Sequence, residues 1–205
     1  EKAVCNNFKP QQVTRASMAN VQKFRLPLIL FVAIASANSP ETIMTIVQHF
    51  RLPLILFAAI GSALTAGIFF AFSTFVMQAL GQQPNASGIA TMQAINITVI
   101  NPWFMVAFFG PGLACLILTV FALRQWEQPG SIYWLVGSLL YLIGTIGVTV
   151  AGNVPLNDAL AIVGPGSADG TTLWTRYLAD WTFWNHVRTA AAFLSASMFT
   201  FSLCL

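Results

Sequence analysis

The side chains with the most chemistry lie together in one short stretch near the C-terminal end of the chain. This stretch contains, in order, Trp181, Trp184, Asn185, His186 and Arg188. In a helix, Trp181 and Asn185 are four residues apart and Asn185 and Arg188 three, so these side chains form one connected surface. A neutral imidazole can remove a proton near pH 7, and a guanidinium can stabilise a developing oxyanion. The stretch is therefore a candidate catalytic or binding site.

A second interpretation of the same stretch is a membrane-interface belt. Tryptophan rings anchor helices at the level of the lipid headgroups, and arginine side chains extend towards the same region. This interpretation accounts for Trp181, Trp184 and Arg188, but a belt has no need of His186. Both interpretations stay open at this point.

The composition indicates an integral membrane protein. The chain has 205 residues, of which 57% are hydrophobic and only 7% are charged, whereas soluble domains are roughly a quarter charged. The lipid bilayer is therefore an expected partner. Nucleic acid is not, because no basic stripe exists outside the N-terminal segment. Two histidines and three scattered cysteines, without a CxxC pair, predict neither a metal site nor a disulfide framework.

The N-terminal segment contains a partial duplication. Residues 18–37 match residues 44–63 at fifteen of twenty positions. The apolar run of the first copy is too short to cross a bilayer. We therefore predict an N-terminal extension, residues 1–43, that lies at the membrane surface or packs peripherally, followed by a transmembrane domain, residues 44–205. The sequence Ala35-Ser36-Ala37 after this run also resembles a signal-peptide cleavage site.

The rest of the chain predicts an all-α fold, a polytopic membrane four-helix bundle. The predicted spans are about 52–80, 102–123, 132–151 and 186–205. Asn101 followed by Pro102 is a helix start, and Pro111 should kink the second span. Spaced apolar residues predict a short interfacial helix within 81–101. The segment 152–180 is rich in Gly, Pro and Ser, and we expect a long extracytoplasmic loop there, between helices 3 and 4.

The distribution of basic residues predicts the topology. The positive-inside rule places the N-terminus, the 124–130 turn and the C-terminus in the cytoplasm. The loops 81–101 and 152–185 then lie outside. This arrangement gathers the following residues at one end of the bundle: Asn101, Asn153, Asn157, Trp181, Asn185, His186 and Arg188. His49 lies at the opposite end, so one haem cannot be held by both histidines of a monomer.

Four motifs, in this order, resemble those of a known family. They are Phe72-Ser73-Thr74-Phe75-Val76-Met77, Asn101-Pro102, Asn153-Val154-Pro155-Leu156-Asn157, and Trp181-x-x-Trp184-Asn185-His186-Val187-Arg188. The family is the anthrone-oxygenase-like group of small four-helix membrane proteins, and the resemblance covers about residues 50–205. It implies oxygenation of polycyclic phenolic anthrones to quinones, with no obvious metal. We predict no cofactor for this reaction.

Roles for the candidate residues follow from this chemistry. Oxidation of an anthrone by dioxygen needs a base, an oxyanion donor and a flat apolar slot. We predict His186 as the base, with Arg188 stabilising the enolate oxygen and keeping the imidazole neutral. The amides of Asn101, Asn153, Asn157 and Asn185 could donate to oxygen atoms, and Trp181 and Trp184 could flank a ring system. Several also have a structural alternative: Asn101 as an N-cap, Asn153 as the cap of a turn that contains Pro155, Asn157 as a partner for buried backbone, and Arg188 as an interfacial anchor.

A second function remains open on the sequence alone. The chain could be a non-enzymatic accessory subunit, packed in a homo-oligomer or a larger membrane complex through the small residues of its first and third spans. It would then bind a quinone, haem or pigment near His186. A flat slot beside His186 would favour the enzyme, which takes a hydrophobic small molecule as substrate.

Overall fold

The computed structural model describes residues 40–205, with side chains described from His49 onward. All regular elements in this range are helical, and they form five continuous helices. The chain divides into two compact units, Glu1–Arg51 and Leu52–Leu205. The second unit contains all the packing discussed below. The predicted extension, residues 1–43, lies almost entirely outside the described residues.

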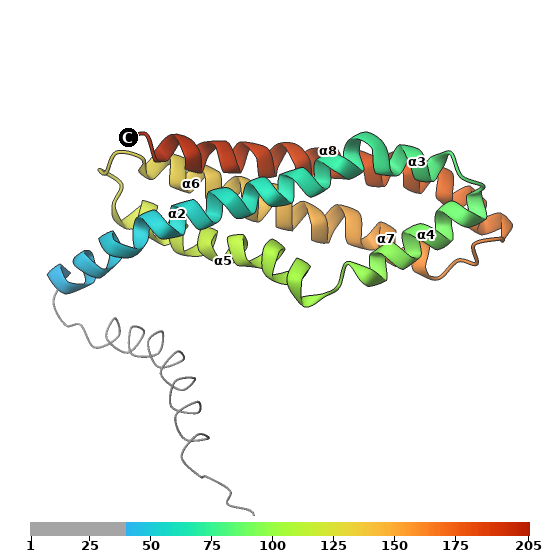
Figure 1. The fold of residues 1–205 in the computed structure, drawn as a ribbon, viewed down its shortest axis with the longest axis horizontal. Helices are drawn as coiled ribbons and strands as arrows, with labels where there is room; N and C mark the ends of the chain where they lie inside the picture. Colours follow the sequence, from blue (N-terminus) through green and yellow to red (C-terminus); the bar gives the residue numbers. More distant parts are fainter. Residues whose placement is uncertain (1–39) are drawn as a thin grey trace, which may run out of the picture. The chain divides into compact units, whose positions relative to one another are not determined.

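The first long helix consists of three continuous segments (Figure 1). It begins as α2 (Pro40–Ala71), passes through the π-helical segment η1 (Phe72–Val76) and ends as α3 (Met77–Gly81). The helix starts earlier than predicted, so Pro53 is an interior residue. The predicted span, about 52–80, lies within it.

The second and third helices follow the sequence signals closely. A helix was predicted within 81–101, and α4 covers Asn85–Thr98. Asn101 then caps α5 (Pro102–Arg124): its side chain accepts a hydrogen bond from the backbone N–H of Phe104 at 3.0 Å. Asparagine at the N-cap and proline at the first helical position are both favoured there. The helix continues through Pro111.

The fourth helix is longer than predicted. It contains α6 (Ser131–Leu139), two π-helical segments, η2 (Leu140–Gly147) and η3 (Thr149–Asn153), and α7 (Val154–Ala161). Pro155 does not end it: the helix continues from η3 into α7, and the proline lies just after this π-helical segment.

The long loop predicted between helices 3 and 4 was wrong. Only residues 162–167 separate α7 from the last helix, α8, which covers Ala168–Ser202. Ser167 starts α8, since its hydroxyl accepts from the N–H of Gly170 at 2.9 Å. Residues 168–185 are therefore helical, and α8 is 35 residues long. The Gly- and Pro-rich composition marks only the short turn before this cap.

Within the described part of the chain, three helices are long and apolar enough to cross a membrane. They are His49–Gly81, Pro102–Arg124 and Ser131–Ala161. The fourth predicted span falls in α8, which is not among them because polar residues such as Asn185, His186 and Arg188 interrupt its apolar run. The fold is consistent with an integral membrane protein. The number of passes and the side of each terminus stay predictions.

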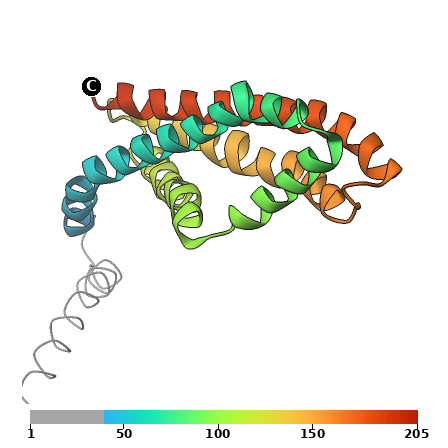
Figure 2. The same ribbon diagram turned by 45° about the vertical axis from the view of Figure 1, so that its right-hand side comes forward.

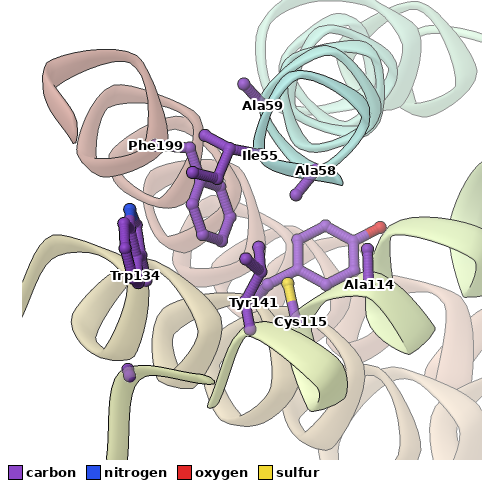
Figure 3. Packing of buried hydrophobic residues seen from close by; sticks show 10 residues of the cluster. Ile55, Ala58, Ala59, Ala114, Cys115, Trp134, Tyr141 and Phe199 are labelled. Carbon is purple, nitrogen blue, oxygen red and sulfur yellow. The ribbon is translucent and has the colours of Figure 1, made fainter. Parts of the chain in front are cut away.

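One end of the assembly is held by an apolar cluster that we call the first core. Figure 3 shows side chains from four helices pointing towards one another there. The buried members are Ile55, Ala58 and Ala59 of α2, Ala114, Cys115, Leu118 and Ala122 of α5, Trp134 of α6, Tyr141 of η2 and Phe199 of α8. Small residues let α2 and α5 approach closely. A Cβ on Gly61, for example, would lie 2.2 Å from Cγ of Pro111.

The other end has a different composition, and we call this cluster the second core. Its members are Met77 and Leu80 of α3, Ile89 and Met92 of α4, Leu160 of α7, and Trp174, Tyr177 and Trp181 of α8. Figure 2 shows α4, α7 and the first half of α8 drawn together at this end. The long loop of the prediction is thus replaced by a packed helical cap.

Candidate functional site: a cavity with one buried arginine

A cavity of about 320 Å³ is lined by residues of all five helices. Most of its wall is apolar and aromatic. The lining residues are Ile68, Phe69, Phe72, Met92, Ile95, Asn96, Val99, Ile100, Phe104, Met105, Phe108, Phe109, Ile146, Thr149, Val150, Val154, Asn157, Trp181 and Arg188. The volume falls near the lower end of the range for small-molecule sites, roughly 300–1,000 Å³.

Arg188 is the one charged side chain among the described residues that line the cavity. It is only 4% exposed. Its guanidinium carbon lies 4.1 Å from the centroid of the Phe69 ring and 5.1 Å from that of Trp181. Both distances allow cation–π attraction, which partly replaces the lost hydration of the cation.

The hydrogen bonds of Arg188 all go to neutral groups. Nη2 donates to Oδ1 of Asn185 at 2.7 Å, and Nη1 donates to Oγ1 of Thr149 at 3.3 Å. Nε is buried and has no hydrogen-bond partner within the described part of the chain. The ion pair seen in residues 49–205 joins Arg176 to Asp180 on the surface of α8. Arg188 is therefore a buried cation without a carboxylate partner among the described residues.

Asn185 fixes the position of the guanidinium through the hydrogen bond that it accepts from Nη2. It is fully buried, and its Nδ2 donates to the carbonyl of Phe69 and to Oγ of Ser73, both at 2.7 Å. Its Oδ1 is thereby turned towards Arg188. A buried amide whose donor and acceptor atoms are all used is strongly fixed in orientation. Asn185 thus connects the first long helix to the arginine.

Two asparagines on the fourth helix position the Trp181 ring at the cavity wall. Oδ1 of Asn157 accepts from Nε1 of Trp181 and from the hydroxyl of Tyr177, each at 2.8 Å. Nδ2 of Asn153 donates to the backbone carbonyl of Trp181 at 3.1 Å. Burial raises the pKa of Tyr177, so its hydroxyl stays protonated and donates to Asn157 at neutral pH.

Two π-helical segments contribute polar groups to the site. Thr149 and Asn153 are the first and last residues of η3, and Ser73 lies in η1. A π-helical turn adds a residue and shifts the backbone pairing, and such turns are frequent at functional sites. Here they bring the hydroxyls of Thr149 and Ser73 to Arg188 and Asn185, and the amide of Asn153 to the carbonyl of Trp181.

One comparison with known proteins matches the part of the chain that contains most of this site. The family model for anthrone oxygenase matches residues 103–198. Over this stretch the chain is anthrone-oxygenase-like. The match confirms the predicted resemblance, and it includes Thr149, Asn153, Asn157, Asn185 and Arg188. No curated protein and no solved structure matches the chain.

His186 lies outside this cavity. It is exposed and lines a separate groove of about 860 Å³ between the first long helix and α8. The groove is lined by Ala63, Ala66, Gly67, Phe70, Ser73, Thr74, His186, Thr189, Ala190, Phe193, Ala196, Ser197, Thr200 and Phe201. The structure therefore separates the predicted base from Arg188 and from Asn157. Within the described range no three His, Cys, Asp or Glu side chains are grouped to hold a metal ion.

The other predicted residues also fall into two groups, those around the cavity and those away from it. Trp181, Asn153, Asn157, Asn185 and Arg188 come together around the cavity. Asn101 caps α5. Trp184 is 38% exposed and packs on Gly152, where an added Cβ would lie 2.8 Å from its ring. The chemical roles predicted for these side chains stay predictions.

Several site residues have no signal in the sequence. Asn96 and Thr149 are common polar residues on apolar helices, and only the packing brings them to the cavity. Ser73 lies in the first motif of the resemblance, but nothing local predicts its hydrogen bond to Asn185. Tyr177 could have been found from its spacing, because it lies four residues before Trp181 and their rings stack at 6.1 Å. The aromatic wall of Phe69, Phe72 and Phe108 could not be distinguished from ordinary membrane-span composition.

Proposed function

We propose that this protein binds a flat hydrophobic phenol or anthrone in the five-helix cavity and oxidises it with dioxygen within the membrane. The observation that carries the proposal is Arg188, a buried cation with neutral partners at the wall of an aromatic cavity. The anthrone-oxygenase-like match over residues 103–198 supports the reaction class.

The shape and lining of the cavity favour an aromatic ligand. Phe104 and Phe108 stack with ring centroids 5.9 Å apart, and Phe72 and Trp181 meet at 5.6 Å. Rings held in this way can pack against a planar ring system by stacked or edge contacts. The polar groups at the wall are few, which suits a ligand that is apolar except at one or two oxygen atoms.

The charge of Arg188 favours an oxygen atom that becomes negative. A buried charge without a counter-ion is costly, and the cost falls when an anion arrives. An anthrone enolate places much of its negative charge on the former ketone oxygen, which is attached to the central ring. A guanidinium fixed by Asn185 and Thr149 is ready to stabilise that oxygen without further reorganisation.

The overall reaction balances without a further reductant. The enolate gives electrons to dioxygen, and the carbon opposite the ketone forms a bond to one oxygen atom as a hydroperoxide. Loss of the second hydrogen from that carbon as a proton breaks the O–O bond, which leaves a carbonyl and releases water. One dioxygen is therefore consumed for each anthrone converted to a quinone. The reaction is written without a cofactor, as predicted from the sequence.

The proposal gives His186 no part in this chemistry. Catalytic proton transfer requires the base within hydrogen-bond reach of the proton or one water away. His186 lines the groove, whereas Arg188 lines the cavity. The role that the sequence predicts for His186 therefore has no support from its position.

Oxygen uptake by the purified protein in liposomes tests the proposal. With anthrone as substrate, we expect one dioxygen consumed for each quinone formed, at a rate well above that of protein-free liposomes, where anthrone oxidises slowly by itself. Arg188→Met should lower the excess rate at least tenfold. Arg176→Met removes an exposed arginine from the same helix and serves as the matched control, which should keep the wild-type rate.

The proposal fails if the protein adds nothing to the protein-free rate and anthrone does not bind. It also fails if Arg188→Met and Arg176→Met have the same excess rate as the wild type, because the arginine would then have no part in turnover.

A further inference from the structure

The cavity contains a buried cation and no group that could take a proton from its ligand. We infer that it takes a phenolic ligand as the anion, with the oxyanion on Arg188 and the proton released to bulk water instead of to a side chain. This inference rests on the proposed function, since it assumes the same ligand class in the same cavity. Beyond the proposed function, it specifies that the ligand is bound in its ionised form and that Arg188 selects this form.

The first argument is the composition of the cavity wall. Among the described lining residues Arg188 is the only titratable side chain, and the remaining polar groups are Asn96, Thr149, Asn157 and the indole of Trp181. Amides, hydroxyls and indoles do not accept a proton near neutral pH. A neutral phenol bound here would have no protein base to ionise it.

The second argument is the direction of His186, the nearest alternative base in the sequence. It is two positions before Arg188, and two positions correspond to about 200° around an α-helix. The exposures agree, because Arg188 is 4% exposed whereas His186 is exposed. Its side chain opens on the groove with Thr189 and Phe193. A direct proton transfer from the cavity to His186 would have to cross α8.

The third argument is the incomplete pairing of the guanidinium. Asn185 and Thr149 accept hydrogen bonds from Nη2 and Nη1, but they bring no negative charge, and Nε is left without a partner. An anionic oxygen beside the guanidinium supplies the neutralising charge that these partners lack. A neutral phenol would supply only a weak acceptor. The site therefore favours the ionised form of the same ligand.

A pH titration of a bound dye measures this preference directly. The probe is 2-hydroxyanthraquinone, a flat tricyclic phenol whose anion absorbs at a longer wavelength than the neutral form. It is titrated in detergent micelles with the wild-type protein, with Arg188→Met, with Arg176→Met as the matched arginine control, and without protein. Arg188→Gln replaces the Met variant if the latter is not monodisperse.

We expect the bound probe to ionise at least one pH unit lower with the wild-type protein than in protein-free micelles, which is a tenfold increase in its ionisation constant. Arg176→Met should show the same shift. In Arg188→Met the midpoint should return to the protein-free value, because the cation that favours the anion is gone.

Three results would overturn the inference. A probe that binds the wild type with an unshifted midpoint contradicts it but leaves the binding proposal standing. A shift that persists in Arg188→Met, or that disappears in His186→Ala, assigns the effect to another group and contradicts it as well. A probe that does not bind at all overturns both this inference and the proposed function.

Discussion

The two faces of α8 both have polar and aromatic side chains, but the side chains lie in different surroundings. On one face Trp181, Asn185 and Arg188 are buried and line or border the cavity. On the other face His186, Thr189 and Phe193 line the groove and are exposed or partly exposed. We call these the cavity face and the groove face. The comparison shows that the kind of residue is a weaker guide to function than the burial and pairing around it.

The cavity face has a physical property that the groove face lacks. Its polar atoms are fixed by short hydrogen bonds, such as those from Asn185 to Phe69 and Ser73, while one buried donor, Nε of Arg188, is left unused. Fixed dipoles around an unpaired cation are what oxyanion stabilisation needs. On the groove face, His186 has the chemistry of a base but shares its wall with mostly apolar and small side chains.

The largest effect is expected from removing the cation of the cavity face. Arg188→Met should weaken binding of 2-hydroxyanthraquinone about 10- to 100-fold, because a hydrogen bond to a charged group contributes about 1.5–3 kcal/mol. The dye affinity of Arg188→Lys should lie between those of the wild type and Arg188→Met, since lysine keeps a charge but loses the planar fork that meets Asn185 and Thr149. Fluorescence or absorbance titration of the dye measures both. Equal affinities for all three proteins would remove the distinction between the two faces.

The next effect concerns the amide that orients this cation. Asn185→Ala removes the partner of Phe69, Ser73 and Arg188, and we expect it to lower the free energy of unfolding by about 1–3 kcal/mol because buried groups are left unpaired. Ser197→Ala on the groove face is the matched control: its hydroxyl donates to the carbonyl of Phe193 in its own helix through an exposed hydrogen bond, and the change should cost no more than about 1 kcal/mol. Thermal unfolding in detergent compares the two. A control as destabilised as Asn185→Ala would contradict the assignment of the structural network to the cavity face.

Two glycines of α2 allow a similar comparison between a packed and an open position. Gly61→Ala places a Cβ against Pro111 of α5, and we expect a loss of about 1–3 kcal/mol through overpacking. Gly67 lines the groove, and a Cβ there meets nothing within 4 Å. Gly67→Ala should therefore leave stability within about 1 kcal/mol of the wild type or raise it. If Gly67→Ala is the more destabilised of the two, the groove is filled or closed in the folded protein.

The smallest effect is expected from His186 itself. His186→Ala should change dye affinity and anthrone turnover by less than about threefold, which is under 1 kcal/mol, because its side chain lies on the groove face. Oxygen uptake in liposomes measures the turnover. If activity is lost while the protein still folds, His186 is the base that the sequence predicts. The inference that the ligand ionises without a protein base would then be wrong.

The sequence predicts the start of α5 and much of the site well, for local reasons. Asn101 and Pro102 are a complete helix-start signal, and the capping bond to Phe104 is present. The spacing of Trp181, Asn185 and Arg188 predicts their shared face, and all three are buried. In these cases three or four neighbouring residues contain the whole of the information.

The sequence could not predict what depends on distant packing. Pro155 and the glycines near it indicate a loop, but Pro155 stands in the first turn of a helix that continues from η3. The cavity exists because α4, α7 and α8 pack as a cap, and Thr149 reaches it from a π-helical segment. Nor does any local pattern decide which face of α8 holds the ligand, since His186 and Arg188 are only two residues apart.

A structure of the protein with bound 2-hydroxyanthraquinone tests the central claim most directly. The account predicts the ring system between Phe69, Phe108 and Trp181, with its phenolic oxygen within hydrogen-bond distance of the Arg188 guanidinium, and no contact with His186. A ligand seated in the groove between Gly67 and Phe193, with its oxygen on His186, would contradict it.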